Sequence, residues 1–437
     1  MLNKFLDEVC SHIRCKMAHN DIRAELTAHI EEMQSAGKPI DEAIAAMGDC
    51  AEIGAKLDKQ HKPLIEWPLI GLTAVIVIIG GIMAFTNDYV MNHSGSDFMR
   101  FLLFAVLGIT AAAFFMFFNY TKLRDFTWII YGAVWVIFIG SLIMGTRGNV
   151  SYVFLNWIFI AIPLLVAFAG FMDKLRGKGM NGLIISTLLA LVSLIPAVLT
   201  ARRAVIFLLV PFFIMLLAAV YKRHFGVNIK SQKAFLYSGL ALTGLLVILS
   251  VIRNPYRFAR MTDFITNVPE GNAWLISALR DAISSANWIG GADIVYSYAP
   301  SVAVPNLMAD FALANVIITF GWLAGIVLVA AIIALIVRMF MITRKVKHDF
   351  GYYISLAACV MLSMQFVISV LMNLGMFPFM GVSLPFVSHG GTGYAANMVL
   401  VGLILSVWRR NNIIGKVPRE NKNIQPLVEY ADGKNNI

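Results

Sequence analysis

Long runs of apolar residues dominate this sequence and restrict what it can fold into. A bilayer core of roughly 30 Å requires about 20 apolar residues per helix, and ten stretches come close to that length. Within lipid a segment must satisfy its own backbone polar groups, which forces a helix. We therefore predict an all-α polytopic membrane protein with about ten transmembrane helices. The segments lie at approximately residues 67–86, 101–119, 126–145, 152–172, 180–200, 204–221, 234–252, 311–337, 351–375 and 393–408.

The composition agrees with this class. Hydrophobic residues make up 59% of the chain and charged residues only 14%, whereas soluble domains average about half and a quarter. The net charge of +10 comes from basic residues in short loops between the apolar runs. No basic face or base-stacking module appears, so we exclude nucleic acid as a partner and expect membrane lipids instead.

Basic residues in the short loops predict the orientation. One set of alternate loops is rich in them, and the opposite set holds only Arg100, Arg147, Arg202 and Arg203 outside the long loop 253–310. We therefore expect a multi-pass protein of the cell membrane with both termini in the cytoplasm. The basic set comprises Lys122, Arg124, Lys174, Arg176, Lys178, Lys222, Arg223, Lys230, Lys233, Arg344, Lys345, Lys347, Arg409 and Arg410.

The chain divides by polarity into three parts. Residues 1–63 are polar and predict a small cytoplasmic helical domain, with no apolar segment of a cleavable signal peptide. Residues 64–412 form the predicted membrane domain, and residues 413–437 a polar cytoplasmic tail. Cysteine spacing matches neither a zinc site nor a disulfide framework.

Two outward loops are unusual. Loop 253–310 is far longer than most connections, and loops of that length tend to be functional. Segment 376–392 is rich in Gly, Pro and Ser, which predicts a re-entrant or tightly turned segment lining a cavity. Both are expected on the same side of the membrane.

The strongest motif is MGVSLPFVSHGGTGYAANMVLVGLILSV at residues 380–407, which closely resembles the signature of the SEDS family (FtsW, RodA and SpoVE). A second stretch runs from Pro305 to Asp310-Phe311 and is followed by Gly321 at the family's spacing. Arg100 stands at the position of a family arginine. The signature positions are occupied by Gly381, Leu384, Pro385, Ser388, Gly390 and Gly391. Pro378 precedes them, and Gln365 lies thirteen residues before Pro378, as in family members.

This resemblance implies a peptidoglycan glycosyltransferase. Such an enzyme polymerises the lipid-linked disaccharide-peptide precursor, lipid II, on the outer face of the membrane in division, elongation or sporulation. It also implies a class B penicillin-binding protein, a transpeptidase, as the partner. Asp310 stands where the family has its proposed catalytic residue. No cofactor is evident, because nucleotide and protein-held zinc motifs are absent, while a divalent cation requirement is left open.

The reaction needs a base for a sugar hydroxyl and positive charge near the departing diphosphate. Asp310 is the candidate base, with a helix N-cap as the alternative for this residue. The outward arginines are candidates for the diphosphate, with snorkelling toward head groups as their alternative. Glycines beside Ser388 would admit the ligand or simply permit a turn. The expected substrate-binding residues are Arg100, Arg202, Arg203, Arg260, Gln365, Ser388, Gly390 and Gly391.

Two other functions remain open at this stage. A lipid-precursor flippase or transporter would also use a helical bundle, although transporters often carry mid-helix charges that are scarce here. A catalytically inactive scaffold for a cell-wall synthase is the other. It draws on Ala197, Ile318 and Thr319, which stand where the family has acidic residues.

Overall fold

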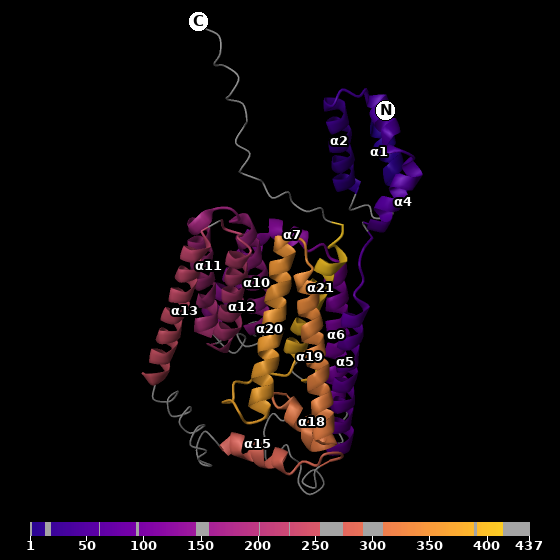
Figure 1. Cartoon of the computed structure of the whole chain (residues 1–437). Helices are drawn as coiled ribbons and strands as arrows, with labels where there is room; N and C mark the ends of the chain where they lie inside the picture. The colour runs from indigo at the N-terminus through magenta and orange to yellow at the C-terminus, as the bar shows by residue number, and fades with distance from the viewer. Residues whose placement is uncertain are drawn as a thin grey trace. The chain divides into compact units, whose positions relative to one another are not determined.

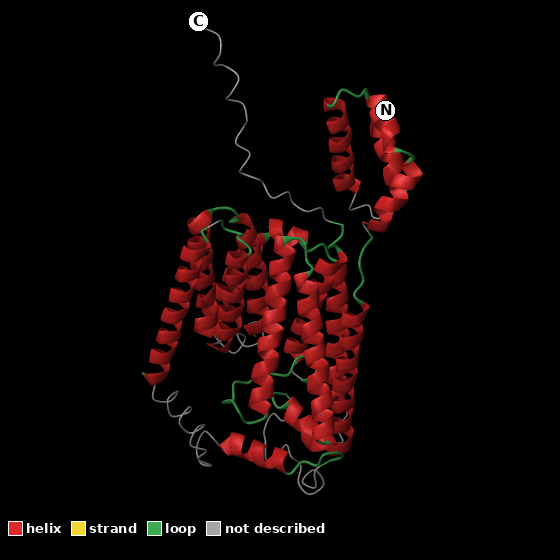
Figure 2. Ribbon diagram, in the orientation of Figure 1, coloured by secondary structure: helices red, strands yellow, loops and turns green. Residues whose placement is uncertain are grey.

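The computed structural model describes residues 2–13, 19–60, 62–92, 96–145, 157–200, 202–226, 228–253, 274–291, 309–388 and 391–413. Within these ranges every regular element is a helix (Figure 2). The chain separates into two compact units, one of Met1–Pro63 with Arg410–Ile437 and one of Leu64–Arg409.

The first unit contains four helices: α1 (Leu2–Ser11), α2 (His19–Ser35), α3 (Ile40–Met47) and α4 (Cys50–Gln60). Their apolar faces form a small core around Val9, Ile22 and Ile30, each at most 1% exposed. α3 ends at Gly48, whose φ of +97° suits glycine.

The second unit carries the apolar helices, and each of the ten predicted segments is helical, with segment 311–337 divided between α18 and α19 (Figure 1). Five are long and apolar enough to cross a membrane, and among the described residues Thr127–Gly140, Val205–Tyr221 and Gly393–Arg409 are shorter apolar helices. The all-α, multi-pass membrane architecture is therefore confirmed. The helices are α5 (Trp67–Thr86), η2 (Asn87–Asn92), α6 (Ser96–Phe117), α7 (Thr121–Asp125), α8 (Thr127–Gly145), α10 (Trp157–Lys174), α11 (Gly179–Thr200), α12 (Arg202–Tyr221), α13 (Ile229–Ile252), α15 (Trp274–Ser284), α18 (Ala312–Phe320), α19 (Trp322–Arg344), α20 (Asp349–Asn373) and α21 (Gly391–Arg409).

The predicted single helix at 311–337 is wrong, because the chain reverses at Gly321 between α18 and α19. Gly321 has a φ of +92°, and a Cβ there would lie 2.7 Å from the carbonyl oxygen of Trp288. The two helices fold back on each other, since Gly325 contacts both Ile317 and Leu313. α18 has nine residues, so its start lies about 13 Å along the helix from the turn.

Glycines allow α6 and α21 to pack closely. A Cβ on Gly402 would lie 2.6 Å from the backbone oxygen of Ala112, and one on Gly108 would lie 2.9 Å from Tyr394. Small residues are the usual means by which membrane helices approach each other, since lipid offers no hydrophobic driving force for association. The close packing against α6 holds α21 in place, and α21 follows segment 376–388.

Ion pairs join the helices at the end of the bundle that holds the basic loops. Arg124 on α7 contacts Asp173 on α10 at 2.8 Å. Asp349 at the start of α20 lies 3.4 Å from both Arg176 and His224. The start of α18 lies toward the other end, near the end of α20.

Candidate functional site

Asp310 lies two residues before the first residue of α18, Ala312, and is half-buried. Its carbonyl oxygen accepts a hydrogen bond from Nδ2 of Asn373, the last residue of α20, at 3.1 Å. Oδ1 of the same amide accepts the backbone N–H of Ala314 at 2.9 Å. The N-cap position of α18 is Phe311. The Asn373 amide thus satisfies a backbone N–H in the first turn of this helix.

Asn373 is itself fixed on α20. Its Nδ2 also donates to the carbonyl oxygen of Ser369 at 2.7 Å and lies 3.3 Å from the Ser369 hydroxyl. Both residues are fully buried. One amide therefore joins the end of α20 to the backbone of Asp310, and a buried amide with this many partners has a single orientation.

Ser388 holds the chain on the other side of Asp310. Its hydroxyl donates to the carbonyl oxygen of Ala309, and the side chain is 4% exposed. Ser388 follows a turn in which Phe386 adopts a left-handed φ of +65°. The rings of Phe311 and Phe379 stack with centroids 5.4 Å apart. The segment after α20 is therefore tightly turned, as predicted, and packs against the start of α18.

Gln365 contacts segment 376–388 within the helical bundle. It lies eight residues before the end of α20, which corresponds to about 12 Å along the helix. Its Nε2 donates to the carbonyl oxygen of Ser383 at 3.1 Å. Its Oε1 is buried and has no hydrogen-bond partner within the described part of the chain. Leaving a buried acceptor unpaired costs about 1–3 kcal/mol, so this oxygen is suited to accept a donor from a bound molecule or water.

Arg280 connects the long loop to the same region. It lies on α15, whose apolar side chains Ile276, Leu279 and Ile283 are buried at helical spacing. Its Nε and Nη2 donate to the carbonyl oxygen of Gly375 at 3.1 and 2.6 Å. A guanidinium at the C-terminal end of α20 also complements the helix dipole. Figure 1 shows α15 and α18 at the same end of this unit.

The structure thus brings Asp310, Gln365 and Ser388 together around segment 376–388. Sequence reasoning missed Asn373, Ser369 and Arg280. The sequence contained an indication of Ser369 and Asn373, because both are polar residues within the apolar run of α20. Polar groups inside a membrane are energetically unfavourable and usually functional.

The remaining predicted residues lie elsewhere or outside the described chain. Arg100 is exposed near the start of α6. Arg202 and Arg203 lie in the first turn of α12, but their side chains are not among those described. Arg260 and Gly390 lie outside the described residues. Gly391 begins α21, where a Cβ would overlap the ring of Phe104. This glycine therefore serves close packing.

Metal binding was left open by the sequence. Across the described ranges, no group of three or more His, Cys, Asp or Glu side chains could hold a metal ion. Asp310 contributes one carboxylate to this region. A cation bound beside it would need most of its ligands from a substrate, as Mg²⁺ often takes them from phosphates.

Comparison with known proteins identifies the family to which the chain is similar. The family model of FtsW/RodA/SpoVE cell cycle proteins matches residues 61–413. The "Probable peptidoglycan glycosyltransferase FtsW" of Hydrogenovibrio crunogenus is 26% identical over 380 residues, which is 80% of this chain and 92% of that protein. The protein of the same name from Trichlorobacter lovleyi is 25% identical over 377 residues, 80% of this chain and 96% of that one.

Two solved structures share the fold. A chain from "Structural coordination of polymerization and crosslinking by a peptidoglycan synthase complex" superposes with a TM-score of 0.65 at 19% identity, over 79% of this chain and 98% of that one. The Thermus thermophilus rod shape determining protein RodA gives a TM-score of 0.54 at 18% identity, over 79% and 97%. The helical architecture is therefore common to all three proteins.

Proposed function

The chain belongs to the FtsW/RodA/SpoVE family, and on that basis we propose that it is a peptidoglycan glycosyltransferase acting on lipid II. The 4-hydroxyl of one saccharide attacks the anomeric carbon of another, the bond from that carbon to the diphosphate breaks, and polyprenyl diphosphate leaves. Asp310 takes the proton of the attacking hydroxyl. General-base assistance of this kind contributes about 10²- to 10⁴-fold in rate.

The arrangement around Asp310 is the observation that supports this role. The carbonyl groups of Asp310 and of the residue before it are each held by a buried side chain, Asn373 and Ser388. The backbone that carries the carboxylate is therefore fixed from two sides. A catalytic group gains from such fixing because a displacement of about 1 Å can cost about 10²-fold in rate.

Positive charge for the departing diphosphate is the second requirement. Arg100 is exposed near the start of α6 and is suited to phosphate oxygens, which guanidinium groups bind in bidentate fashion. Arg280 is engaged with the Gly375 carbonyl, so we assign it to the scaffold. A divalent cation, where required, would be held mainly by the diphosphate.

We further infer that catalysis takes place on the outer face of the membrane, with both termini in the cytoplasm. The basic loops support this orientation, because cytoplasmic loops carry an excess of Lys and Arg. Asp310 lies toward the opposite end of the bundle from the Arg124–Asp173 pair of those loops. A class B penicillin-binding protein is the proposed partner, since a similar chain was solved within a peptidoglycan synthase complex.

One observation favours a second candidate, an inactive scaffold for a cell-wall synthase. Two positions on α18 that carry acids in the family are neutral here. Ile318 is 1% exposed, and the Thr319 hydroxyl donates to Oδ1 of Asn315 at 3.3 Å. α18 thus offers no carboxylate beyond Asp310 at its start.

Purified protein in liposomes with lipid II separates the candidates. The glycosyltransferase forms glycan polymer, alone or with the transpeptidase, whereas a flippase moves precursor across the bilayer without polymer. A scaffold does neither, yet still binds the transpeptidase. Absence of polymer in the complex, with binding intact, would refute the enzymatic assignment.

A further inference from the structure

The bundle around segment 376–388 contains polar side chains that lack partners among the described residues. Oε1 of Gln365 on α20 and Oδ1 of Asn397 on α21 are both buried, and neither accepts a hydrogen bond. The Tyr394 hydroxyl on α21 and both amide atoms of Asn87, at the start of η2, are likewise unpaired. All four side chains are at most 3% exposed. Unpaired groups this deeply buried are rare, because nothing compensates for the hydration that they lose.

Gln365 and Asn397 lie on helix faces that contact the same residue of the segment. Nε2 of Gln365 donates to the carbonyl oxygen of Ser383 at 3.1 Å. On α21, a Cβ on Gly393 would lie 3.5 Å from the Ser383 hydroxyl oxygen. Asn397 follows Gly393 by four residues, so it projects from the same face of α21, one turn further along. Both unpaired oxygens therefore belong to the surroundings of Ser383.

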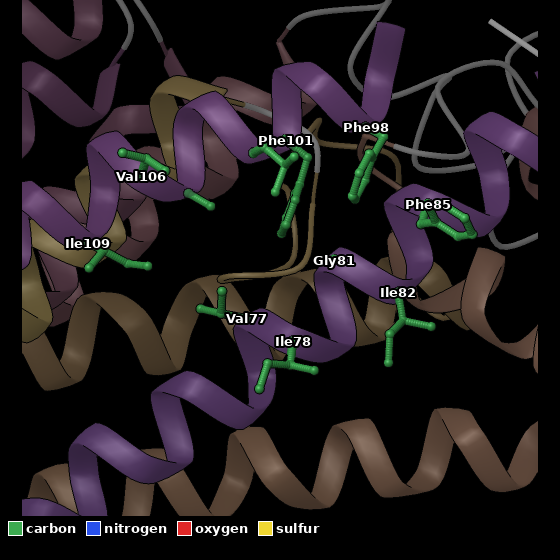
Figure 3. Close-up of a pocket in the computed structure, with 11 residues that line it drawn as sticks. Val77, Ile78, Gly81, Ile82, Phe85, Phe98, Phe101, Val106 and Ile109 are labelled. Carbon is green, nitrogen blue, oxygen red and sulfur yellow. The ribbon is translucent and has the colours of Figure 1, made fainter. Parts of the chain in front are cut away.

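Tyr394 and Asn87 approach the segment from the side of α5 and α6. A Cβ on Gly80 of α5 would lie 3.0 Å from the carbonyl oxygen of Phe386 and 3.3 Å from the Phe101 ring. Phe101 projects from α6 toward α5 (Figure 3), and its ring packs edge-on against Tyr394 with centroids 5.7 Å apart. Asn87 follows Gly80 by two helical turns and shares its face of α5. Helices α5, α20 and α21 thus each carry unpaired polar groups near the segment.

The backbone of the segment adds unpaired donors. Val382, Leu384, Phe386 and Val387 are each 1% exposed, and within the described residues none of their N–H groups bonds to another backbone group. Phe386 also has a left-handed φ of +65°, which a large side chain rarely adopts. Buried N–H groups are nearly always paired, with ordered water where protein partners are lacking. Irregular backbone at membrane depth is tolerated where it is enclosed by protein or lines water.

The chemistry of these groups restricts what can satisfy them. Gln365 and Asn397 offer acceptors, whereas Tyr394, Asn87 and the backbone N–H groups offer donors, so the partner must both donate and accept. None of these side chains is charged, which favours a neutral molecule. Their exposed fractions leave no room for a molecule as large as a sugar. Water meets these conditions, because one buried water molecule binds two to four polar groups.

We propose that ordered water molecules occupy an internal site between segment 382–388 and the unpaired groups of α5, α20 and α21. The water supplies the hydrogen bonds that a helix would make within itself, so the segment remains irregular inside a membrane-spanning bundle. Ser388 at its end can then reach the carbonyl oxygen of Ala309. This inference does not depend on glycosyl transfer, since an inactive scaffold with the same fold would hold the same water.

Radiolytic footprinting of the full-length protein in detergent tests the site. Hydroxyl radicals formed from a bound water label only the side chains beside it, and mass spectrometry locates the product. Phe386 and Phe168 are both 1% exposed, but Phe168 packs against the ring of Phe212 with centroids 4.5 Å apart. We expect Phe386 to be labelled and Phe168 to stay at background. Background labelling of both residues would overturn the proposal.

Hydrogen exchange distinguishes resident water from opening of the bundle. The amides of α21 should exchange slowly, because their helical hydrogen bonds stay closed while Phe386 is labelled. Fast exchange over Tyr394–Asn397 in the same sample would mean that bulk solvent enters the bundle. That result would contradict an internal site even if Phe386 were labelled.

Matched asparagine variants localise the water. Asn397→Leu replaces an unpaired amide by an apolar group of similar size, and Phe386 should lose its label, whereas Asn397→Ser keeps a hydroxyl and should retain it. Asn315→Leu on α18 is the control, because Asn315 is 2% exposed but already accepts the Thr319 hydroxyl at 3.3 Å. Asn87→Leu repeats the test from α5 should Asn397→Leu fail to fold. Phe386 labelling as strong in these leucine variants as in the control would refute the site.

Discussion

Replacing Asn373 by Ala tests whether the backbone around Asp310 must be fixed for activity. The substitution removes the bonds to the Asp310 carbonyl and the Ala314 N–H. Hydrogen bonds between membrane helices average about 0.6 kcal/mol, with a maximum near 1.7. Two lost bonds therefore predict a destabilisation of about 1–3 kcal/mol. Displacement of the carboxylate by about 1 Å predicts a loss of about 10²-fold in kcat.

Two measurements follow from this prediction. Thermal unfolding in detergent gives the stability, and lipid II polymerisation at saturating substrate gives kcat. Ser369→Ala is the graded control, because it removes only the hydroxyl that lies 3.3 Å from the Asn373 amide. It should change kcat by less than about threefold, equivalent to under about 0.7 kcal/mol. A wild-type kcat in Asn373→Ala would refute the argument that this amide positions Asp310.

Three further substitutions or treatments have defined outcomes. Ser388→Ala removes the bond to Ala309 and should lower kcat about tenfold with KM unchanged, as measured by initial polymerisation rates. Gly402→Leu forces a Cβ into the Ala112 backbone and should lower the Tm in scanning fluorimetry. Burial raises the pKa of the Cys50 thiol, so less of it is thiolate at neutral pH; iodoacetamide should modify it slowly at pH 7, and faster as pH rises or after unfolding.

Each of these has a direct control. Gly132→Leu lies on α8 where nothing is within 4 Å of a Cβ, and it should leave the Tm unchanged. A Tm loss equal to that of Gly402→Leu would contradict the packing argument. Thr110→Ala removes an exposed hydroxyl whose bond to Val106 lies within α6 and should retain kcat. For Cys50, equal modification rates in folded and unfolded protein at pH 7 would show that burial does not govern the thiol.

The sequence predicted the helices well because each apolar run is long enough to be helical in lipid. It did not predict the reversal at Gly321. An uninterrupted apolar run gives no change of period where the chain turns, and the turn depends on the backbone of Trp288, which lies in the long loop. Conformation at this glycine is therefore a property of the tertiary structure.

Only part of the site was predicted, because some of its contacts depend on the tertiary structure. Asp310, Gln365 and Ser388 could be chosen because each belongs to a motif that resembles a family pattern. Asn373 acts on residues 59 and 63 positions away, and Arg280 on a carbonyl 95 positions away. Such pairings arise only when helices pack, so no local pattern reports them.

The central claim is that the Asp310 carboxylate removes a proton from the attacking sugar hydroxyl. The most direct measurement compares lipid II polymerisation by Asp310→Asn with that by Asp281→Asn, which changes an exposed acid on α15 in the same way. Loss of a general base predicts a rate at least about 10²-fold lower for Asp310→Asn and a wild-type rate for Asp281→Asn. Equal rates in the two variants, both folded, would contradict the account.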